Sequence, residues 1–250
     1  MSISYSENII VVGGTSEIGL AITKALIKRG AKVTVIGRNI DKLTAMFSDF
    51  GDELHYFSCD LSQEQERKKI LQESIKITGL FTGIIYVAGY HRLMPIGPSY
   101  SSSLTEHLKI NVEAPLDLIQ IFINKKISND KYQRSITILS SVAHLLGEPA
   151  LSAYGASKGA IVSAVRSLAV ELARKNIRIN TVSPGWIEGE SATKVRKQIS
   201  EESRDHILSN YPLGFGAPED VAEAVSFISS PCAKWITGTD LIVDGGRSVV

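Results

Sequence analysis

The sequence predicts an α/β protein with a Rossmann-type doubly wound parallel sheet of about seven strands, flanked by helices on both faces. First, short β-branched runs alternate with longer amphipathic stretches along the 250 residues. Second, these runs are apolar along most of their length, which is typical of parallel strands covered on both faces. The runs are Ile9–Val12, Lys32–Ile36, Leu54–Phe57, Gly83–Val87, Ser135–Leu139, Ile177–Val182 and Asp240–Val243.

Amphipathic stretches lie between most of these runs and are expected to form the covering helices. No linker or internal repeat interrupts the alternation, so one domain over residues 1–250 is expected. Ligands of doubly wound sheets bind beyond the carboxyl ends of the strands. The polar segment 186–213 follows the sixth run and is a candidate lid over a substrate. The clearest helical stretches are Ile18–Arg29, Gln63–Ile77, Leu104–Asn124 and Ala153–Arg174.

Composition and charge argue against several classes of function. The formal net charge of +1 gives no broad attraction to nucleic acid or to an anionic membrane. No apolar run is long enough to cross a bilayer, and the first residues do not resemble a signal peptide. Cys59 and Cys232 lie far apart, and the five histidines lack the spacing of zinc ligands. We therefore expect a cytoplasmic protein with no metal, no nucleic-acid partner and no membrane partner.

A small-residue turn, Gly13-Gly14-Thr15-Ser16-Glu17-Ile18-Gly19, follows the first run and leads into a helix. Small residues let the backbone turn tightly and leave amide groups at the helix N-terminus to hold a pyrophosphate. The alternative is a tight strand-to-helix turn in which Thr15 or Ser16 caps the helix. The position after the first strand of an α/β chain favours the dinucleotide.

The end of the second run indicates which dinucleotide the chain prefers. An acidic residue there selects NAD through its ribose hydroxyls, whereas an arginine suits the 2′-phosphate of NADP. The sequence reads Gly37-Arg38-Asn39, with no acid. Arg38 can clamp a phosphate with two donors, although it can also be an ordinary exposed arginine. Its position predicts NADPH as the cofactor.

A serine, a tyrosine and a lysine follow the fifth run. Ser140 and Ser141 come directly after it, and Tyr154 and Lys158 lie one helical turn apart on one face of the next helix. A free tyrosine has a pKa of about 10, and a neighbouring ammonium lowers it by favouring the phenolate. Tyr154 is therefore a candidate general acid for a carbonyl oxygen. The alternative is an exposed helical pair without a chemical role.

Motifs along nearly all of the 250 residues resemble those of the short-chain dehydrogenase/reductase family in its single-domain branch. They fall in the family's order, and Ser141 precedes Tyr154 at the family's separation. The matching elements are Gly13-x3-Glu17-x-Gly19, Asp60, Ala88-Gly89, Asn111, Ser141, Tyr154-x3-Lys158, Asn180, Pro184-Gly185, Ile236-Thr237-Gly238 and Val243-Asp244-Gly245-Gly246.

This resemblance implies a role for each matching residue. Tyr154 would donate the proton, and Lys158 would lower its pKa and hold the nicotinamide ribose. Ser141 would bind the substrate carbonyl, Asn111 would keep a water in a proton relay, and Asp60 would reach the adenine. The implied cofactor-binding residues are Gly13, Thr15, Ser16, Glu17, Ile18, Gly19, Arg38, Asp60, Leu61, Ala88, Gly89, Tyr154, Lys158, Pro184, Gly185 and Ile187.

The chain departs from the family pattern at its phosphate turn. Glu17 replaces the middle glycine and either crowds the cofactor or points away and suits the helix dipole. Where the family usually carries a threonine that touches the cofactor, this chain has Gly189, and Ser191 or Thr193 could supply the hydroxyl.

Two polar positions of the family on neighbouring strands are apolar in this chain. Val12 replaces a threonine, and the Asn-Asn-Ala-Gly motif reads Tyr86-Val87-Ala88-Gly89. Exchanging both ends of a buried polar contact can be almost neutral, whereas exchanging one end leaves an orphan. Our hypothesis is a paired replacement, so that Val87→Asn alone destabilises the fold.

The substrate is less determined than the reaction. The pattern most resembles 3-oxoacyl-acyl-carrier-protein reductases, so a small ketone or an acyl-carrier-bound substrate is expected. Any single pocket residue can equally be a surface or packing residue. The residues that family position puts near the pocket are His91, Arg92, Met94, His144, Leu146, Trp186 and Tyr211.

Two surface features bear on partners. Cations at the ends of helices either form a basic rim near the site for an acidic carrier protein or simply suit the helix dipoles. Small residues along one helix either pair subunits into a homotetramer or pack within one subunit. The cations are Lys125, Lys126, Lys131, Arg134 and Lys175, and the small residues are Ala156, Gly159, Ala160, Ser163 and Ala164.

Three functions are compatible with these motifs. The leading interpretation is an NADPH-dependent ketoreductase acting on a 3-oxoacyl thioester. The second is an alcohol dehydrogenase acting on a steroid, a sugar or a small alcohol. The third is a non-catalytic nucleotide-binding partner or sensor, which Glu17 and Gly189 favour. The four intact catalytic residues oppose it, namely Asn111, Ser141, Tyr154 and Lys158.

Overall fold

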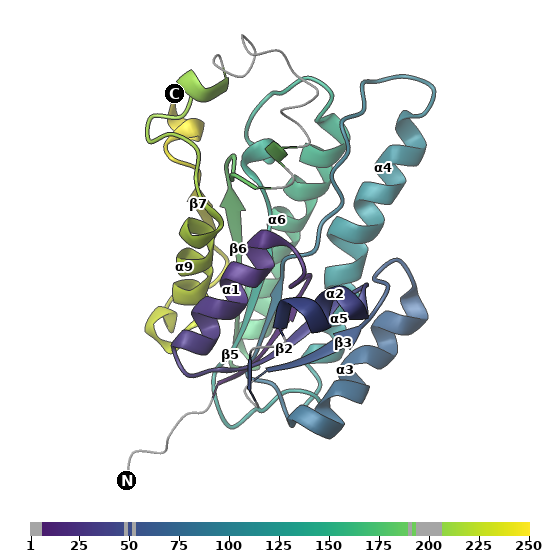
Figure 1. Ribbon diagram of the computed structural model, residues 1–250, viewed down its shortest axis with the longest axis vertical. Coiled ribbons are helices and arrows are strands. Elements are labelled where there is room, and N and C mark those ends of the chain that lie inside the picture. The colour runs from purple at the N-terminus through teal and green to yellow at the C-terminus, as the bar shows by residue number, and fades with distance from the viewer. Residues whose placement is uncertain (1–6, 48–49, 52–53, 190–191, 194–206) are drawn as a thin grey trace.

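The computed structural model describes residues 7–47, 50–51, 54–189, 192–193 and 207–250. Seven parallel strands form one sheet in the order β3-β2-β1-β4-β5-β6-β7 (Figure 1), which confirms the predicted fold class. The strands are β1 (Asn8–Val12), β2 (Lys32–Gly37), β3 (Leu54–Ser58), β4 (Gly83–Tyr86), β5 (Arg134–Leu139), β6 (Ile177–Pro184) and β7 (Asp240–Val243).

Helices cover both faces of the sheet and enclose two hydrophobic cores (Figure 1). One core packs α3, α5 and α6 against the sheet, and the other packs α1, α2 and α9 against the opposite face. Such burial explains why the strands are apolar on both faces. The helices are α1 (Glu17–Lys28), α2 (Ile40–Phe47), α3 (Glu64–Thr78), α4 (Tyr100–Leu108), α5 (Ala114–Phe122), α6 (Ser152–Ala173) and α9 (Pro218–Ser229).

The strand order creates a crevice at the carboxyl edge of the sheet. β1 pairs with β2 on one side and β4 on the other, so the chain direction across the sheet reverses at β1. Val12 aligns with Ile36 in β2 and with Tyr86 in β4. The turns after these three strands therefore open at the same level, where doubly wound sheets bind their ligands.

The helix predicted over Leu104–Asn124 is divided in the structure. α4 ends at Leu108, a π-helical turn spans Lys109–Glu113, and α5 begins at Ala114. The periodicity of apolar residues in the sequence indicates the buried face of a helix, but it does not indicate that one turn contains the extra residue of a π-helix. π-turns inside helices frequently mark functional sites, and this one holds the buried Asn111.

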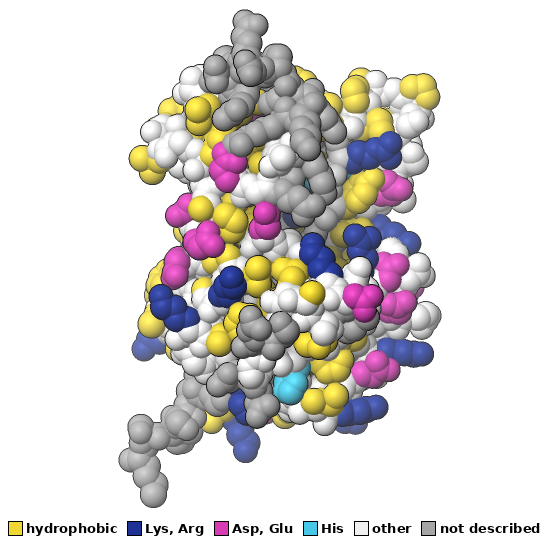
Figure 2. Space-filling view, in the orientation of Figure 1, with side chains coloured by type: hydrophobic (Ala, Val, Ile, Leu, Met, Phe, Trp, Pro, Cys, Tyr) yellow, Lys and Arg dark blue, Asp and Glu magenta, His cyan; other side chains and the backbone are white. Residues whose placement is uncertain are grey.

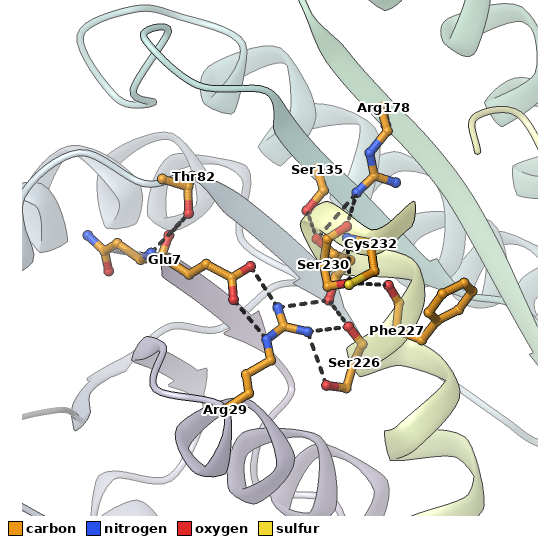
Figure 3. Close-up of polar contacts among 11 residues, drawn as sticks. Glu7, Arg29, Thr82, Ser135, Arg178, Ser226, Phe227, Ser230 and Cys232 are labelled. Atoms are coloured by element: carbon orange, nitrogen blue, oxygen red, sulfur yellow. Dashed lines mark hydrogen bonds and ion pairs between the residues drawn. The ribbon is translucent and has the colours of Figure 1, made fainter. Parts of the chain in front are cut away.

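The amino edge of the sheet holds a buried polar network (Figure 3). Arg29, at the end of α1, forms an ion pair with Glu7 and donates to the carbonyl and hydroxyl oxygens of Ser226 in α9. Arg178 of β6 donates to main-chain oxygens of Ile228, Ser229, Ser230 and Ile236. The network links α1, β6 and α9 at the amino edge of the sheet.

The predicted basic rim lies at this same amino edge and not beside the site. Arg134 is the first residue of β5 and donates to the Lys175 carbonyl oxygen, while Lys125 pairs with Asp130. Ser141 follows the other end of β5, and a strand rises about 3.3 Å per residue, so roughly 20 Å separates the two ends. The prediction is wrong within one chain because helices return to the amino edge of a parallel sheet. The dipole interpretation fits Lys125, Lys126 and Lys175, which follow the carboxyl ends of α5 and α6.

The outer surface carries charges of both signs. On the face drawn in Figure 2, lysine and arginine side chains alternate with aspartate and glutamate. Across the described ranges, no helix has both the length and the apolarity that crossing a bilayer requires.

Candidate active site

The phosphate turn has a backbone that demands glycine. Gly13 adopts φ +91°, and a Cβ on it would lie 2.5 Å from the Ala88 nitrogen. A Cβ on Gly19 would lie 2.5 Å from the Gly13 carbonyl oxygen. Ser16 caps α1 by accepting a hydrogen bond from the Gly19 amide at 3.0 Å. The turn thus brings backbone close to the crevice and opens the first turn of α1 toward it, which fits the diphosphate of a dinucleotide.

The neighbouring strand ends carry the other predicted cofactor residues. Thr15 packs on Gly37, where a Cβ would meet its methyl group at 2.8 Å. Arg38 is exposed directly after β2. Asp60 follows β3, and hydrogen bonds from Ser62, with a smaller effect from Arg38, lower its pKa. The structure therefore brings Arg38 and Asp60 to the same corner of the crevice.

The remaining predicted cofactor residues sit close to these turns. Ile18 lies in α1 and packs against the core, and Leu61 is buried after Asp60. The Ala88 amide donates to the Val12 carbonyl oxygen at 3.0 Å, which fixes the turn after β4 against β1. Gly89 is exposed next to it.

Glu17 and Gly189, the two departures at the phosphate turn, are one spatial feature. A Cβ on Gly189 would lie 2.0 Å from Glu17 Oε2, and Gly189 adopts φ +151°. The carboxylate of Glu17 therefore lies over the main chain of Gly189, where a larger residue would have no room. Glu17 also stands in the first turn of α1, where a negative charge suits the helix dipole. Neither sequence interpretation anticipated this contact.

Tyr154 and Lys158 share one face of α6 below the crevice. Lys158 is 3% exposed, and its Nζ donates to the Leu139 carbonyl oxygen at 2.7 Å. The same ammonium lies 5.8 Å from the centroid of the Tyr154 ring. Tyr154 is partly exposed, so its ring borders the crevice rather than the core. The alternative of an exposed helical pair is wrong, because Lys158 is buried.

Ser141 and Asn111 complete this cluster from two other elements. Ser141 follows β5 and hydrogen-bonds Tyr154 through its side chain. The preceding Ser140 points inward and donates to the Lys158 carbonyl oxygen at 3.1 Å. A Cβ on Gly89 would lie 3.6 Å from both Asn111 Oδ1 and Lys158 Nζ. The four predicted catalytic residues therefore converge on the crevice.

Burial controls the protonation of the tyrosine and the lysine. Burial raises the pKa of Tyr154, and the hydrogen bond with Ser141 opposes part of that rise. Burial also lowers the pKa of Lys158 from 10.5 to about 8. Desolvation of the phenol is the largest effect, so the net shift of the Tyr154 pKa is upward, and the lowering by Lys158 that the resemblance implies stays a prediction. Tyr154 is thus held in its protonated form at neutral pH.

The loop after β6 forms the far wall. The Gly185 amide donates to the Val243 carbonyl oxygen, and a Cβ on Gly185 would meet Asp244 at 2.9 Å. Pro184 ends β6, and Ile187 forms a bridge with Gly216. Trp186 stacks on Phe215 at 5.2 Å, and Tyr211 meets the same ring edge-on. Much of the predicted lid, 186–213, including Ser191, lies outside the described residues.

The structure places the predicted pocket residues differently: His91 contacts Tyr154, whereas His144 and Met94 bond to the protein itself. His91 packs edge-on against Tyr154, with ring centroids 4.7 Å apart. Both ring nitrogens of His144 instead contact protein oxygens: Nδ1 lies 2.5 Å from the Ser141 carbonyl oxygen and Nε2 lies 3.3 Å from the Asp240 carboxylate. Met94 donates its amide to the Ala150 carbonyl oxygen, which joins the loop after β4 to the one before α6.

The apolar replacements on β1 and β4 leave no orphaned polar atom nearby. Val12 is fully buried, and its carbonyl oxygen accepts from the Val87 amide at 2.8 Å. Tyr86 fills the adjacent space and donates its hydroxyl to the Ile110 carbonyl oxygen at 2.7 Å. Among the described residues, the buried side-chain atoms that lack a partner all lie elsewhere. The arrangement is compatible with a paired replacement.

Sequence reasoning missed the residues that hold the cluster in place. The fully buried Ser157 accepts from Asn111 Nδ2 at 2.9 Å and donates to the Tyr154 carbonyl oxygen. His107 is fully buried, with its ring centroid 6.0 Å from that of Tyr154. A polar residue four positions before Asn111, on the apolar face of a helix, was the available signal for His107.

Comparison with known proteins identifies the family. Residues 13–248 match a family model described as enoyl-(acyl carrier protein) reductase. The chain is 33% identical over 241 residues to 3-oxoacyl-[acyl-carrier-protein] reductase from Homo sapiens, covering 96% of this chain and 97% of that protein. This chain belongs to the short-chain dehydrogenase/reductase family.

Solved structures agree with this membership. A short-chain type dehydrogenase/reductase from Mycobacterium ulcerans superimposes with a TM-score of 0.89 at 26% identity, covering 99% of this chain and 92% of that one. ElxO with NADP bound gives a TM-score of 0.87 at 25% identity, covering 98% and 100%. The protein is an oxidoreductase that acts on CH–OH or C=O groups with a nicotinamide dinucleotide.

Proposed function

We propose that this chain is an NADPH-dependent carbonyl reductase whose substrate is a 3-oxoacyl thioester. The observation that carries the proposal is the convergence of Ser141, Tyr154 and the buried Lys158 beside a glycine turn that admits a diphosphate. Tyr154 and Lys158 lie one turn apart on α6, whereas Ser141 and the glycine turn come from other elements that only the fold brings beside them.

The cofactor residues support NADPH. The turn Gly13–Gly19 would hold the diphosphate at the N-terminus of α1, and Asp60 would face the adenine. Arg38 is exposed after β2, where no acidic residue follows, and suits a 2′-phosphate. Lys158 would hold the nicotinamide ribose, and Ile187 would face the nicotinamide. NADPH, when bound, supplies the hydride that reaches the carbonyl carbon.

The chain's own residues manage the proton. Tyr154 remains protonated because burial raises its pKa, so it can donate to a carbonyl oxygen. Ser141 hydrogen-bonds the same oxygen and then stabilises the phenolate. The Lys158 ammonium, 5.8 Å from the ring centroid, offsets the negative charge that Tyr154 acquires. Asn111 would hold a water through which the proton on Tyr154 is replaced.

Two observations favour a 3-oxoacyl thioester. The human relative is named for a 3-oxoacyl-acyl-carrier-protein substrate and matches over nearly its full length. His91 packs against Tyr154, and the loop after β6 carries Trp186, which clusters with Tyr211 and Phe215. These side chains combine polar groups with apolar surface, which suits an acyl chain that bears two carbonyls.

We also propose a cytoplasmic homotetramer. The exposed residues Ala156, Ser163 and Val170 recur every seven positions along α6, and Val170 is 74% exposed. A small or apolar stripe of this kind lets two helices approach closely across a two-fold axis. Trp235, 96% exposed, adds apolar surface beside β7. Both cysteines are free thiols, which is compatible with a reducing compartment.

A panel of ketones and 3-oxoacyl thioesters, followed by nicotinamide absorbance with NADPH and NADH, tests the function. We expect turnover of a 3-oxoacyl thioester with NADPH. The Tyr154→Phe variant should bind NADPH but lose about 10²–10⁴-fold in kcat. Equal consumption of cofactor by the variant and the wild type would remove Tyr154 as the acid. Unchanged NADPH preference in Arg38→Ala would remove the cofactor argument.

A further inference from the structure

The loop after β4 is fixed against α4 and the π-turn. Tyr90 exchanges two main-chain hydrogen bonds with the Asn111 side chain, at 2.8 and 3.0 Å. Its hydroxyl donates to Glu106 at 2.6 Å. The Arg92 amide donates to His107 Nε2 at 3.3 Å. His91 lies between these anchored residues, so its main chain is held in place on both sides.

Three histidines surround the site, and their ring nitrogens differ in what they bind. His107 is buried, with Nδ1 2.7 Å from the Ser103 carbonyl oxygen and Nε2 accepting from Arg92. His144 faces the Ser141 carbonyl oxygen and Asp240. Neither ring nitrogen of His91 hydrogen-bonds a described residue, and the residue is exposed. Two of the imidazoles have structural partners, while the third is available to a ligand.

The available imidazole is also the one nearest the proposed acid. The His91 and Tyr154 rings meet edge to face at 86°, with centroids 4.7 Å apart. This separation is short enough for one small molecule to touch both side chains. A ligand whose carbonyl accepts from Tyr154 therefore has His91 as a neighbouring side chain.

We propose that His91 is a substrate-positioning residue that donates a hydrogen bond to the thioester carbonyl while Tyr154 faces the ketone. The inference rests on the proposed function and deepens it. A 3-oxoacyl thioester carries a second carbonyl two carbons from the one that is reduced. A hydrogen bond from His91 to that second oxygen favours the binding of 3-oxoacyl thioesters over that of simple ketones.

The protonation state of His91 suits this role. Although the residue is exposed, the protein around the ring partly desolvates it, and this desolvation, together with His107 and Lys158, lowers the pKa of His91 below the ordinary value of 6.5, so the neutral ring predominates at pH 7. A neutral imidazole has one N–H donor and one acceptor. It can donate to a carbonyl oxygen without placing a second cation beside Lys158.

Two matched substrates isolate this contact. One is an acetoacetyl thioester, and the other is the thioether in which a methylene replaces the thioester carbonyl. Two variants separate the contribution of the aromatic ring from that of the hydrogen bond. His91→Phe keeps the edge-to-face packing without a donor, and His91→Gln keeps a donor without the ring. A contact to a carbonyl that does not react contributes to binding in the ground state and the transition state alike.

We expect His91→Phe to raise KM for the thioester about tenfold, with kcat little changed, because one hydrogen bond is lost. The thioether ketone should be unaffected, and His91→Gln should recover most of the thioester affinity. NADPH affinity, measured separately by fluorescence, should stay constant in both variants.

Equal losses on both substrates, or none on either, would overturn the role of His91 and leave the carbonyl reductase intact. A Gln variant as impaired as the Phe variant would do the same. If the wild type reduces neither substrate although it binds NADPH, the proposed function fails and the role of His91 falls with it.

Discussion

Two buried cations at opposite edges of the sheet differ in how fully they are hydrogen-bonded. Arg178, at the amino edge, is 4% exposed and donates to four main-chain carbonyl oxygens and to the Gln133 side chain. Lys158, at the carboxyl edge, is 3% exposed and donates to one carbonyl oxygen. Burial lowers the pKa of Lys158 to about 8.

The difference separates a structural charge from a reactive one. A buried charge surrounded by acceptors is locked in its ionised form and joins the elements around it. A buried charge with few partners is destabilised, titrates within reach of physiological pH and can respond to a ligand. The polar groups at the amino edge therefore stabilise the packing of the elements around them, whereas Lys158 at the carboxyl edge can interact with a ligand.

The largest effect is expected from Arg178→Leu. The substitution leaves several buried carbonyl oxygens without donors, so the free energy of unfolding should fall by roughly 3–4 kcal/mol. Denaturant unfolding measures this loss. The turnover of the fraction that remains folded should match the wild type, since the network lies away from Tyr154. A stable variant with impaired turnover would contradict the division between the two edges.

The contact between Glu17 and Gly189 predicts the next effect. Gly189→Ala places a Cβ where the carboxylate lies and strains the backbone, which should cost about 2–3 kcal/mol of stability. Adding Glu17→Gly relieves the steric part, so the double variant should be more stable than the two single effects predict. A double-mutant cycle of unfolding and of NADPH affinity measures a coupling of about 1–2 kcal/mol. Strict additivity would mean that the two departures are independent.

Lys158→Met is expected to gain stability while losing activity. Removing a poorly partnered buried ammonium should raise the free energy of unfolding at pH 7 by about 1–2 kcal/mol, after the lost bond to Leu139 is counted. The folded pKa, about 8, lies below the ordinary 10.5. The wild type therefore gains stability as the pH rises between these values, because its unfolded state binds more protons there. The advantage of the variant should shrink over this range, and a constant advantage would contradict it.

Val87→Asn carries the smallest expected effect. The amide would enter a partly buried position beside the apolar Val12, so the free energy of unfolding should fall by about 1 kcal/mol. Val12→Thr together with Val87→Asn should recover part of the loss by providing a partner. A clear gain in stability from Val87→Asn alone would refute the paired replacement.

The strands and the candidate site follow from sequence to different degrees. Apolar runs predicted all seven strands to within about two residues, because strands buried on both faces leave an unbroken signal. The candidate site residues came from motif order, and the structure brings Ser141, Tyr154 and Lys158 together as that order implies. Helices α2 and α9 gave no clear early signal of their own.

The features that the sequence did not predict are contacts between residues that are far apart in the chain. Glu17 and Gly189 are far apart in the chain, and only the closed fold shows that one fills the space above the other. The π-turn at Asn111 and the locking of His107 likewise depend on contacts with the loop after β4. The misplaced basic rim had a different cause, because the direction of helices relative to parallel strands was available from the fold class.

The most direct measurement is an NMR titration of the lysine side chains in the folded protein, with Lys158→Met to assign the signal. One ammonium is predicted to titrate near pH 8, to vanish in the variant and to lie well below the others. A Lys158 signal that titrates near its ordinary 10.5 would contradict the claim that this edge holds an under-partnered, reactive cation.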